Sequence, residues 1–200
     1  GPGRRVLELG AGGGMHTWAL LQTGAEVMAS DISLISLRLL QQRFGHKSGN
    51  LETAVADMEK LPFDTNSFDV VASAGSLSYG DPKLVDSEIR RVLRPGGILI
   101  CVDSLNHNLI YRFNRWIHYL RGNRSKSTLK RMPDIKRIEM LRHGFDQYEL
   151  KYFGALSFVM PVVSRMVGDD SAQVFSDYFD QLIGVRHSAF KFVLVAKHLS

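Results

Sequence analysis

A glycine-rich segment between an apolar run and a helical pattern constrains the fold more than any other feature. Residues 6–14 read VLELGAGGG, with four glycines directly after the apolar run. Glycine allows a tight turn, and it lets a ligand press against bare backbone amides. The segment therefore predicts a buried strand, a loop and a helix, with a nucleotide-like ligand at the loop. A tight structural turn without a ligand would use the same residues.

The first hundred residues alternate short apolar runs with helical patterns, which is typical of βαβ units and an open parallel sheet. Asp81 and Pro82 mark the start of one helix, and Pro95-Gly96-Gly97 is expected to end it. Strands are expected over 5–9, 26–30, 51–56, 68–73 and 98–103, and two further helices over 15–23 and 34–44, the second capped by Ser33.

The pattern changes after residue 104. Residues 106–131 combine aromatic and basic side chains in a helical pattern, and another helix is expected over 133–143. Alternating polar and apolar residues predict a half-exposed strand near 148–152, and an apolar run predicts a last strand over 190–196. A long apolar and aromatic insertion, residues 154–188, separates these two strands.

Composition narrows the class of protein. With 44% hydrophobic and 22% charged residues, the 200-residue chain suits one globular α/β domain and excludes a disordered, collagen-like or coiled-coil protein. The single cysteine, Cys101, lies in an apolar run and is interpreted as a core thiol, which excludes a disulfide framework and suits a reducing, cytoplasmic setting. The seven histidines lack metal-site spacing, so no metal is predicted.

No segment is long enough to cross a membrane as a helix. The longest apolar stretch, residues 154–168, includes Pro161 and Arg165 and falls short of the about twenty apolar residues that a spanning helix needs. The chain starts at Gly1 without a methionine and reaches its first strand after four residues, so we expect that residues were removed ahead of it.

Two acids follow neighbouring strands of the predicted sheet. Asp31 comes at the end of the second strand, twenty-one residues after Gly10, where a carboxylate can accept both hydroxyls of a ribose. A plain helix-capping role is less needed, because Ser33 is available for it. Asp57 follows the third strand and reaches the same edge of the sheet. A dinucleotide fingerprint requires Gly or Ala where this chain has Met15, which weighs against a nicotinamide cofactor.

Five motifs over residues 5–103 together resemble those of class I S-adenosylmethionine-dependent methyltransferases, of the type 11-like group with a GxGxG motif. They are VLELGAGGG at 6–14, Asp31 after the second strand, DMEKLPF at 57–63, FDVV at 68–71 and RPGG at 94–97. The resemblance implies an α/β Rossmann-like fold, a doubly wound seven-stranded sheet that is mostly parallel with an antiparallel strand 7.

The resemblance also implies a binding site for S-adenosylmethionine, which leaves as S-adenosylhomocysteine after the transfer. The acid and glycines of the first motif would hold the methionine end and the adenosine backbone. Asp31 would bind the ribose diol, and Asp57 the adenine amino group. Two apolar residues would contact the adenine, and the residues that leave the fourth strand would pass beside the sulfonium. The implied cofactor-binding residues are Glu8, Gly10, Ala11, Gly12, Asp31, Ile32, Asp57, Met58, Ser73 and Ala74.

An activated sulfonium methyl needs little acid–base machinery, because the protein mainly aligns the nucleophile and excludes water. A hydroxyl acceptor would still require a base. The candidate catalytic residues are Tyr79, which follows the fourth strand, Asp103, which ends the fifth, and His107, four residues later. His187 is a further histidine to consider, and for both histidines a surface or hydrogen-bonded role is the plainer alternative.

Charge is divided unevenly along the chain, which bears on the acceptor. Residues 1–105 carry 10 Lys or Arg and 12 Asp or Glu, whereas residues 106–200 carry 15 and 8. We expect a cofactor-binding core over 1–104, and over 105–200 the completion of the same domain with acceptor-binding insertions at 105–135 and 154–188. The basic and aromatic residues after 105 indicate an anionic or membrane-adjacent acceptor, or else a solvated helix.

The predicted function is methyl transfer to a small-molecule acceptor. A similarity of residues 105–133 to methyltransferases of glycan assembly favours a saccharide or a lipid-linked saccharide. Nucleic acid is less favoured, because no RNA-binding module signature is present. Contact with a membrane surface and the oligomeric state stay open. Two other functions also stay open: an NAD(P)-dependent oxidoreductase on a Rossmann sheet, and a non-catalytic relative that binds the cofactor without turnover.

Overall fold

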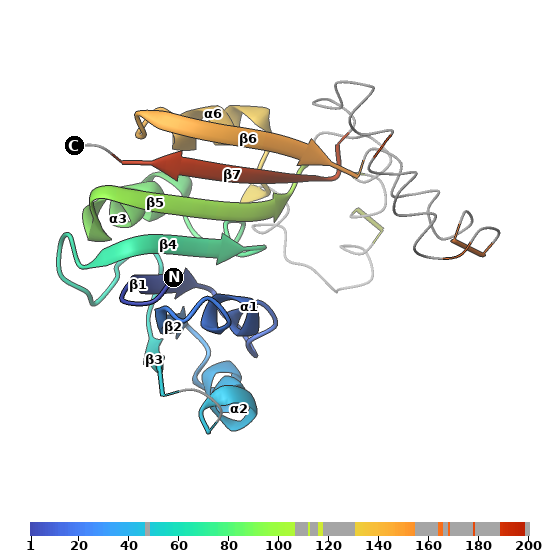
Figure 1. Ribbon diagram of the computed structural model, residues 1–200. Coiled ribbons are helices and arrows are strands. Elements are labelled where there is room, and N and C mark those ends of the chain that lie inside the picture. The colour runs from blue at the N-terminus through green and yellow to red at the C-terminus, as the bar shows by residue number, and fades with distance from the viewer. Residues whose placement is uncertain are drawn as a thin grey trace.

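Seven strands form one sheet in the described part of the chain, in the order β3-β2-β1-β4-β5-β7-β6 (Figure 1). The computed structural model describes residues 1–46, 49–106, 131–154 and 189–198, and the isolated positions 112, 116, 117, 164, 165, 168 and 178. The strands are β1 (Arg5–Leu9), β2 (Glu26–Asp31), β3 (Leu51–Val55), β4 (Phe68–Ala74), β5 (Leu93–Ser104), β6 (Gln147–Phe153) and β7 (Lys191–Lys197).

The direction of the strands confirms the predicted sheet. Strands β1 to β5 pair in parallel, whereas β7 is antiparallel to both β5 and β6. The strand order reverses between β1 and β4, because β1 pairs with β2 on one side and with β4 on the other. Open α/β sheets bind ligands beyond the carboxyl ends of the strands at such a switch point. The ends of β1 and β4 are therefore the expected place for a ligand.

Helices cover the two faces of the sheet unequally. Helices α1 (Thr17–Leu21) and α2 (Leu34–Phe44) lie over the β1–β3 half of one face, and α3 (Pro82–Val92) and α6 (Ile135–Arg142) lie on the other face (Figure 1). Each face has its own apolar core, with Leu40 packed in one and Ile89 in the other. On the face of α1 and α2, no described helix covers the β5-β7-β6 half, and Ile100 and Val102 of β5 are only half-buried there.

Local sequence signals explain most element ends. Ser33 caps α2 by accepting a hydrogen bond from the Ser36 amide, and Asp81 caps α3 through the amides of Lys83 and Leu84, as predicted.

Cys101 is fully buried in the core, and burial raises the pKa of its thiol well above its usual value.

The expected boundaries of three elements were wrong. Helix α1 spans only Thr17–Leu21 instead of 15–23. Strand β5 begins at Leu93, directly after α3, because Leu93 pairs with Phe68 and a register shift lets the RPGG segment continue into the sheet. Helix α6 begins at Ile135, because Asp134 caps it by accepting a hydrogen bond from the Arg137 amide.

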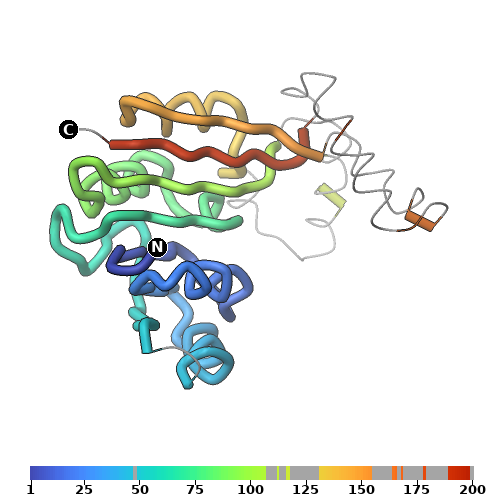
Figure 2. The backbone as a smooth tube through the Cα atoms, viewed as in Figure 1, coloured from blue at the N-terminus to red at the C-terminus, as the bar shows by residue number. Residues whose placement is uncertain are grey.

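Figure 2 follows the chain from the blue N-terminal half of the sheet to the orange and red strands β6 and β7, which complete the far edge. The predicted insertions 105–135 and 154–188 lie largely outside the described residues, as does the helical pattern over 106–131. Among the described residues, no helix has the length and apolar character that a membrane crossing requires.

Candidate functional site

The glycine loop leaves β1 at the switch point of the sheet. Gly10 and Gly12 have positive φ values of 66° and 54°, a region of backbone conformation that side chains disfavour. A Cβ atom on Gly10 would lie 2.5 Å from the Cβ of Ser76, so this position also lacks room for a side chain. Ser76 lies in the turn after β4, and its hydroxyl donates to the Leu9 carbonyl at 2.9 Å. The loop is therefore held against the end of β4.

Asp31 ties the loop to the end of β2. Its carboxylate accepts hydrogen bonds from the amides of Gly12 and Ser33, both at 2.8 Å, one on each oxygen. An ionised carboxylate has about four acceptor sites, so each oxygen of Asp31 can accept a further bond from a ligand. The helix-capping role belongs to Ser33. Asp31 is thus placed as a rigid acceptor at the sheet edge.

A first cavity, which we call the loop cavity, lies beside the glycine loop. It has a volume of about 490 Å³. Asp57, which follows β3, lies on its wall, and its carboxylate accepts a hydrogen bond from the Glu59 amide at 2.9 Å. The structure thus brings both predicted acids to one cavity. Its lining residues are Gly10, Gly12, Ser30, Asp31, Ile32, Ala56, Asp57, Met58, Gly75, Ser76 and Tyr79.

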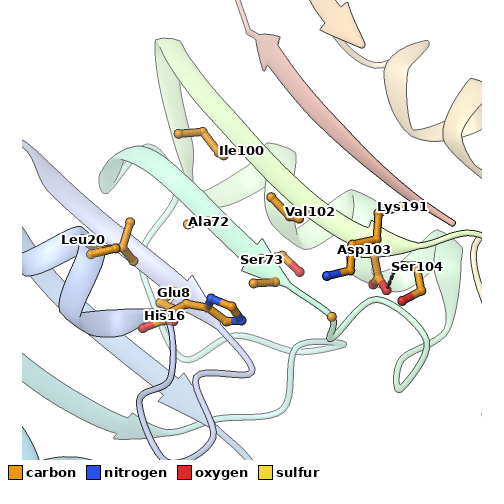
Figure 3. A pocket seen from close by; sticks show the side chains of 13 residues that line it. Glu8, His16, Leu20, Ala72, Ser73, Ile100, Val102, Asp103, Ser104 and Lys191 are labelled. Carbon is orange, nitrogen blue, oxygen red and sulfur yellow. Dashed lines mark hydrogen bonds between the residues drawn. The ribbon is translucent and has the colours of Figure 1, made fainter. Parts of the chain in front are cut away.

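A second cavity, which we call the sheet cavity, adjoins the first at Gly75 and has a volume of about 340 Å³ (Figure 3). Its floor is apolar, formed by side chains of β4 and β5, and α1 forms one wall. Polar side chains gather at the carboxyl ends of the strands. The lining residues are Glu8, His16, Ala19, Leu20, Ala72, Ser73, Ala74, Gly75, Ile100, Val102, Asp103, Ser104 and Lys191.

Glu8 is an acid held in an unfavourable place for its charge. It is 3% exposed, and the Thr17 hydroxyl donates to its carboxylate at 2.5 Å. Burial raises the pKa of Glu8 from 4.5 to about 7, although the hydrogen bond from Thr17 opposes this rise. Near neutral pH this carboxyl can therefore gain or lose a proton in response to a ligand's charge.

The predicted catalytic residues do not converge on one point. Tyr79 is 65% exposed and lines the loop cavity, whereas Asp103 is buried and lines the sheet cavity. Asp103 accepts hydrogen bonds from the amides of Leu77, at 3.2 Å, and Ser104, at 2.6 Å, so it also holds the turn after β4. His107 lies outside the described residues.

Of the ten predicted cofactor-binding residues, nine line one of the two cavities. The tenth, Ala11, is buried, donates its amide to the Ser30 carbonyl at 2.9 Å, and is not among the lining residues described for either cavity. Among the residues that the structure describes, no three His, Cys, Asp or Glu side chains gather as a metal site would require.

Ser76 and Lys191, two polar residues of these cavities, were not singled out from the sequence. Ser76 binds the Leu9 carbonyl and shares a hydrogen bond of 2.7 Å with the Ser73 hydroxyl. Lys191 begins β7 and reaches the sheet cavity from the far side of β5. A lone serine in a turn carries no spacing signal. Lys191 could have been found only from its position at the start of the last strand, which an antiparallel β7 brings to the ligand edge.

One protein-family model matches most of the first half of the chain. Residues 7–101 match a family model described as "Methyltransferase domain". The match begins in β1 and ends in β5, so it spans the glycine loop and both acids that line the loop cavity.

Curated relatives agree with this match. The chain is 41% identical over 101 residues to a demethylmenaquinone methyltransferase of Clavibacter sepedonicus. The aligned segment covers 50% of this chain and 41% of that protein. The chain is 41% identical over 96 residues to an uncharacterized methyltransferase of Mycobacterium tuberculosis, which covers 48% of this chain and 38% of that protein. The similarity thus extends over well under half the length of each of these relatives.

Solved structures share the fold of this chain. Phosphoethanolamine N-methyltransferase 2 of Haemonchus contortus, in complex with S-adenosyl-L-methionine, aligns with a TM-score of 0.70 at 20% identity, covering 100% of this chain and 49% of that one. A putative methyltransferase of Haloferax volcanii, in complex with the Trm112 activator, aligns with a TM-score of 0.70 at 23% identity, covering 100% and 84%. At these identities the likeness concerns the fold.

Proposed function

Because residues 7–101 match a family model described as a methyltransferase domain, we propose that the protein transfers a methyl group from S-adenosylmethionine to a small-molecule acceptor. The observation that carries this proposal is the convergence of Asp31, Asp57 and the bare glycine loop on the loop cavity. The acceptor would then enter the adjoining sheet cavity, next to Ser73 and Ala74.

The loop cavity and the Glu8 end of the sheet cavity suit the proposed cofactor in size and in hydrogen-bonding chemistry, which leaves the rest of the sheet cavity to the acceptor. The volumes of the two cavities, about 490 and 340 Å³, lie in the range of small-molecule sites, and the cavities meet at Gly75. The side chain missing at Gly10 leaves the backbone open on the cavity side, as a closely bound adenosyl group requires. Carboxylates of Asp31 and Asp57 supply acceptors for hydroxyl and amino donors, and Ile32 and Met58 supply apolar surface.

Each charged residue has a distinct proposed role. Asp31, fixed by the amides of Gly12 and Ser33, accepts hydrogen bonds from the ribose hydroxyls. Asp57 accepts one from the adenine amino group. Glu8 receives the ammonium of the methionine end, because a cation nearby favours the ionised form of this buried carboxyl and lowers its raised pKa.

Methyl transfer requires few catalytic groups from the protein itself. Bound S-adenosylmethionine supplies a methyl group on a sulfonium, and transfer forms a bond from the acceptor's electron pair to this methyl while the carbon–sulfur pair stays on sulfur. The protein contributes alignment at the ends of β4 and β5 and exclusion of water. Where the acceptor is a hydroxyl, Asp103 is the described residue best placed to take its proton in the sheet cavity, because Tyr79 lies in the other cavity.

The class of acceptor rests on fewer observations than the cofactor does. The saccharide or lipid-linked saccharide acceptor rests on residues 105–133, which lie mostly outside the described part of the chain, and it stays a prediction. A relative named for demethylmenaquinone supports a small-molecule acceptor. The apolar floor of the sheet cavity, formed by Ala72, Ile100 and Val102, favours an acceptor with an apolar portion.

Binding and turnover together test the proposal. S-adenosylhomocysteine is expected to raise the melting temperature of the purified protein, whereas NAD and NADP are not. Transfer of label from methyl-labelled S-adenosylmethionine to a panel of saccharide, lipid and RNA extracts then identifies the class of acceptor. Stabilisation by NAD alone would favour the oxidoreductase, and cofactor binding without transfer to any extract would favour a non-catalytic binding protein.

A further inference from the structure

We propose that Lys191 is a specificity-determining residue that binds an anionic oxygen of the acceptor at the far end of the sheet cavity. This assignment rests on the proposed methyltransferase function, in which the acceptor occupies that cavity. It defines the acceptor as an apolar molecule that carries an acidic oxygen, such as a carboxylate or a phenolate.

The position of Lys191 follows from the topology of the sheet. Strand β7 runs antiparallel to β5, so its first residue lies at the carboxyl end of β5, opposite Ser104. Lys191, although it lies near the C-terminal end of the chain, is therefore at the sheet edge where β1 and β4 also end. Figure 3 shows its ammonium group pointing into the cavity, on the side of Asp103 and Ser73.

The charge of Lys191 is available to a ligand. Within the described part of the chain, Lys191 forms no ion pair, and its ammonium lies 5.8 Å from the centroid of the Phe190 ring. Asp103 also faces the cavity, on the same side as Lys191 (Figure 3), and its carboxylate accepts the amides of Leu77 and Ser104. On the opposite side, Glu8 is hydrogen-bonded to Thr17, and in the proposed complex it faces the ammonium of the cofactor.

The surroundings of this cation select for an amphipathic anion. Between the ends of the cavity the floor consists of Ala72, Ile100 and Val102, with Leu20 on the wall, and none of these side chains can bind a polar group. A sulfonium at the end of β4 would add a second positive charge. An acceptor oxygen with a negative charge is attracted by both cations, whereas a cationic acceptor is repelled by both.

The test compares two isosteric probes. We expect 2-naphthoate to bind the protein, both without and with S-adenosylhomocysteine, in a fluorescence titration. Lys191→Met should weaken this binding by about tenfold or more, because a charge-assisted hydrogen bond is lost. Lys191→Arg should retain most of it. The neutral 2-naphthamide should bind the native protein and Lys191→Met with equal affinity, since it tests apolar contact alone.

Lys197→Met is the matched control, because Lys197 lies on the same strand and the same face but at the opposite end of β7, beside Ile98. It should leave naphthoate affinity unchanged, and a thermal melt checks that each variant is folded. Equal naphthoate affinity of the native protein and Lys191→Met, or no naphthoate binding at all, overturns the role of Lys191. Failure of S-adenosylhomocysteine to bind the native protein overturns the proposed function instead.

Discussion

The carboxylate of Asp31 accepts a hydrogen bond from the Gly12 amide at 2.8 Å, so the acid at the end of β2 and the loop after β1 are held together by the chain itself. The Ser76 hydroxyl, bound to the Leu9 carbonyl, adds the turn after β4 to the same unit. Three strand ends are thus fixed relative to one another. A site assembled in this way needs little rearrangement when a ligand binds, which reduces the entropic cost of binding.

The glycine loop predicts a contrast between two substitutions. Gly10→Ala places a Cβ 2.5 Å from the Cβ of Ser76, in addition to the disfavoured φ, and should lower the free energy of unfolding by roughly 2 kcal/mol or more. Gly12→Ala meets no atom within 4 Å and should cost only about 1 kcal/mol, from its φ alone. Urea unfolding measures both, and equal losses would contradict the close packing of Gly10 on Ser76.

The raised pKa of Glu8 predicts a specific pH dependence of stability. The folded protein holds this proton up to a pKa of about 7, whereas the unfolded chain releases it near 4.5. The stabilisation from the protonated carboxyl is therefore complete below pH 4.5 and is lost as the pH rises to 7. Relative to Glu8→Gln, which cannot ionise, the native protein should lose roughly 3 kcal/mol of unfolding free energy over this range.

Urea unfolding of both proteins at several pH values checks this, and the difference between them is the quantity of interest because other titrating groups cancel. A difference that stays constant between pH 4.5 and 7 would show that Glu8 is ionised in the folded protein. Gln retains the side-chain shape and can accept the hydrogen bond from Thr17, so Glu8→Gln is expected to fold.

A buried ion pair predicts a second contrast. Arg137 of α6 donates to both carboxylate oxygens of Asp86 on α3, and both residues are buried. Arg137→Met leaves Asp86 without its partner and should lower the free energy of unfolding by about 3–5 kcal/mol. Arg142, paired with Glu139 on the same helix, is more exposed, so Arg142→Met should cost far less than Arg137→Met. Similar losses in urea unfolding would contradict this account.

The sequence predicts the sheet well because apolar runs and capping residues act locally. Strands β1 to β4 appear at nearly the expected positions, and Ser33 and Asp81 cap the expected helices. The start of β5 is different, since Leu93 joins the sheet by pairing with Phe68, a contact between distant residues. The RPGG segment interrupts a helix in any context, but only the sheet decides that the strand begins before it.

The candidate site is predictable where it follows strand ends. Asp31 and Asp57 meet at one cavity because the carboxyl ends of parallel strands share one edge. Tyr79 and Asp103 were both candidates for a base, and they line different cavities, because the path of the turn after β4 depends on hydrogen bonds from Ser76 and to Asp103. Such contacts between turns leave no periodic signal in the sequence.

The most direct test of the central claim is the affinity of S-adenosylhomocysteine, measured by titration calorimetry. Asp31→Ala should weaken binding by about 1.5–3 kcal/mol, because the ligand's hydroxyls and the Gly12 amide lose a charged acceptor. Asp64→Ala, an exposed acid away from both cavities, should bind as the native protein does. Unchanged affinity in Asp31→Ala, with a native protein that binds S-adenosylhomocysteine, would place the cofactor site elsewhere.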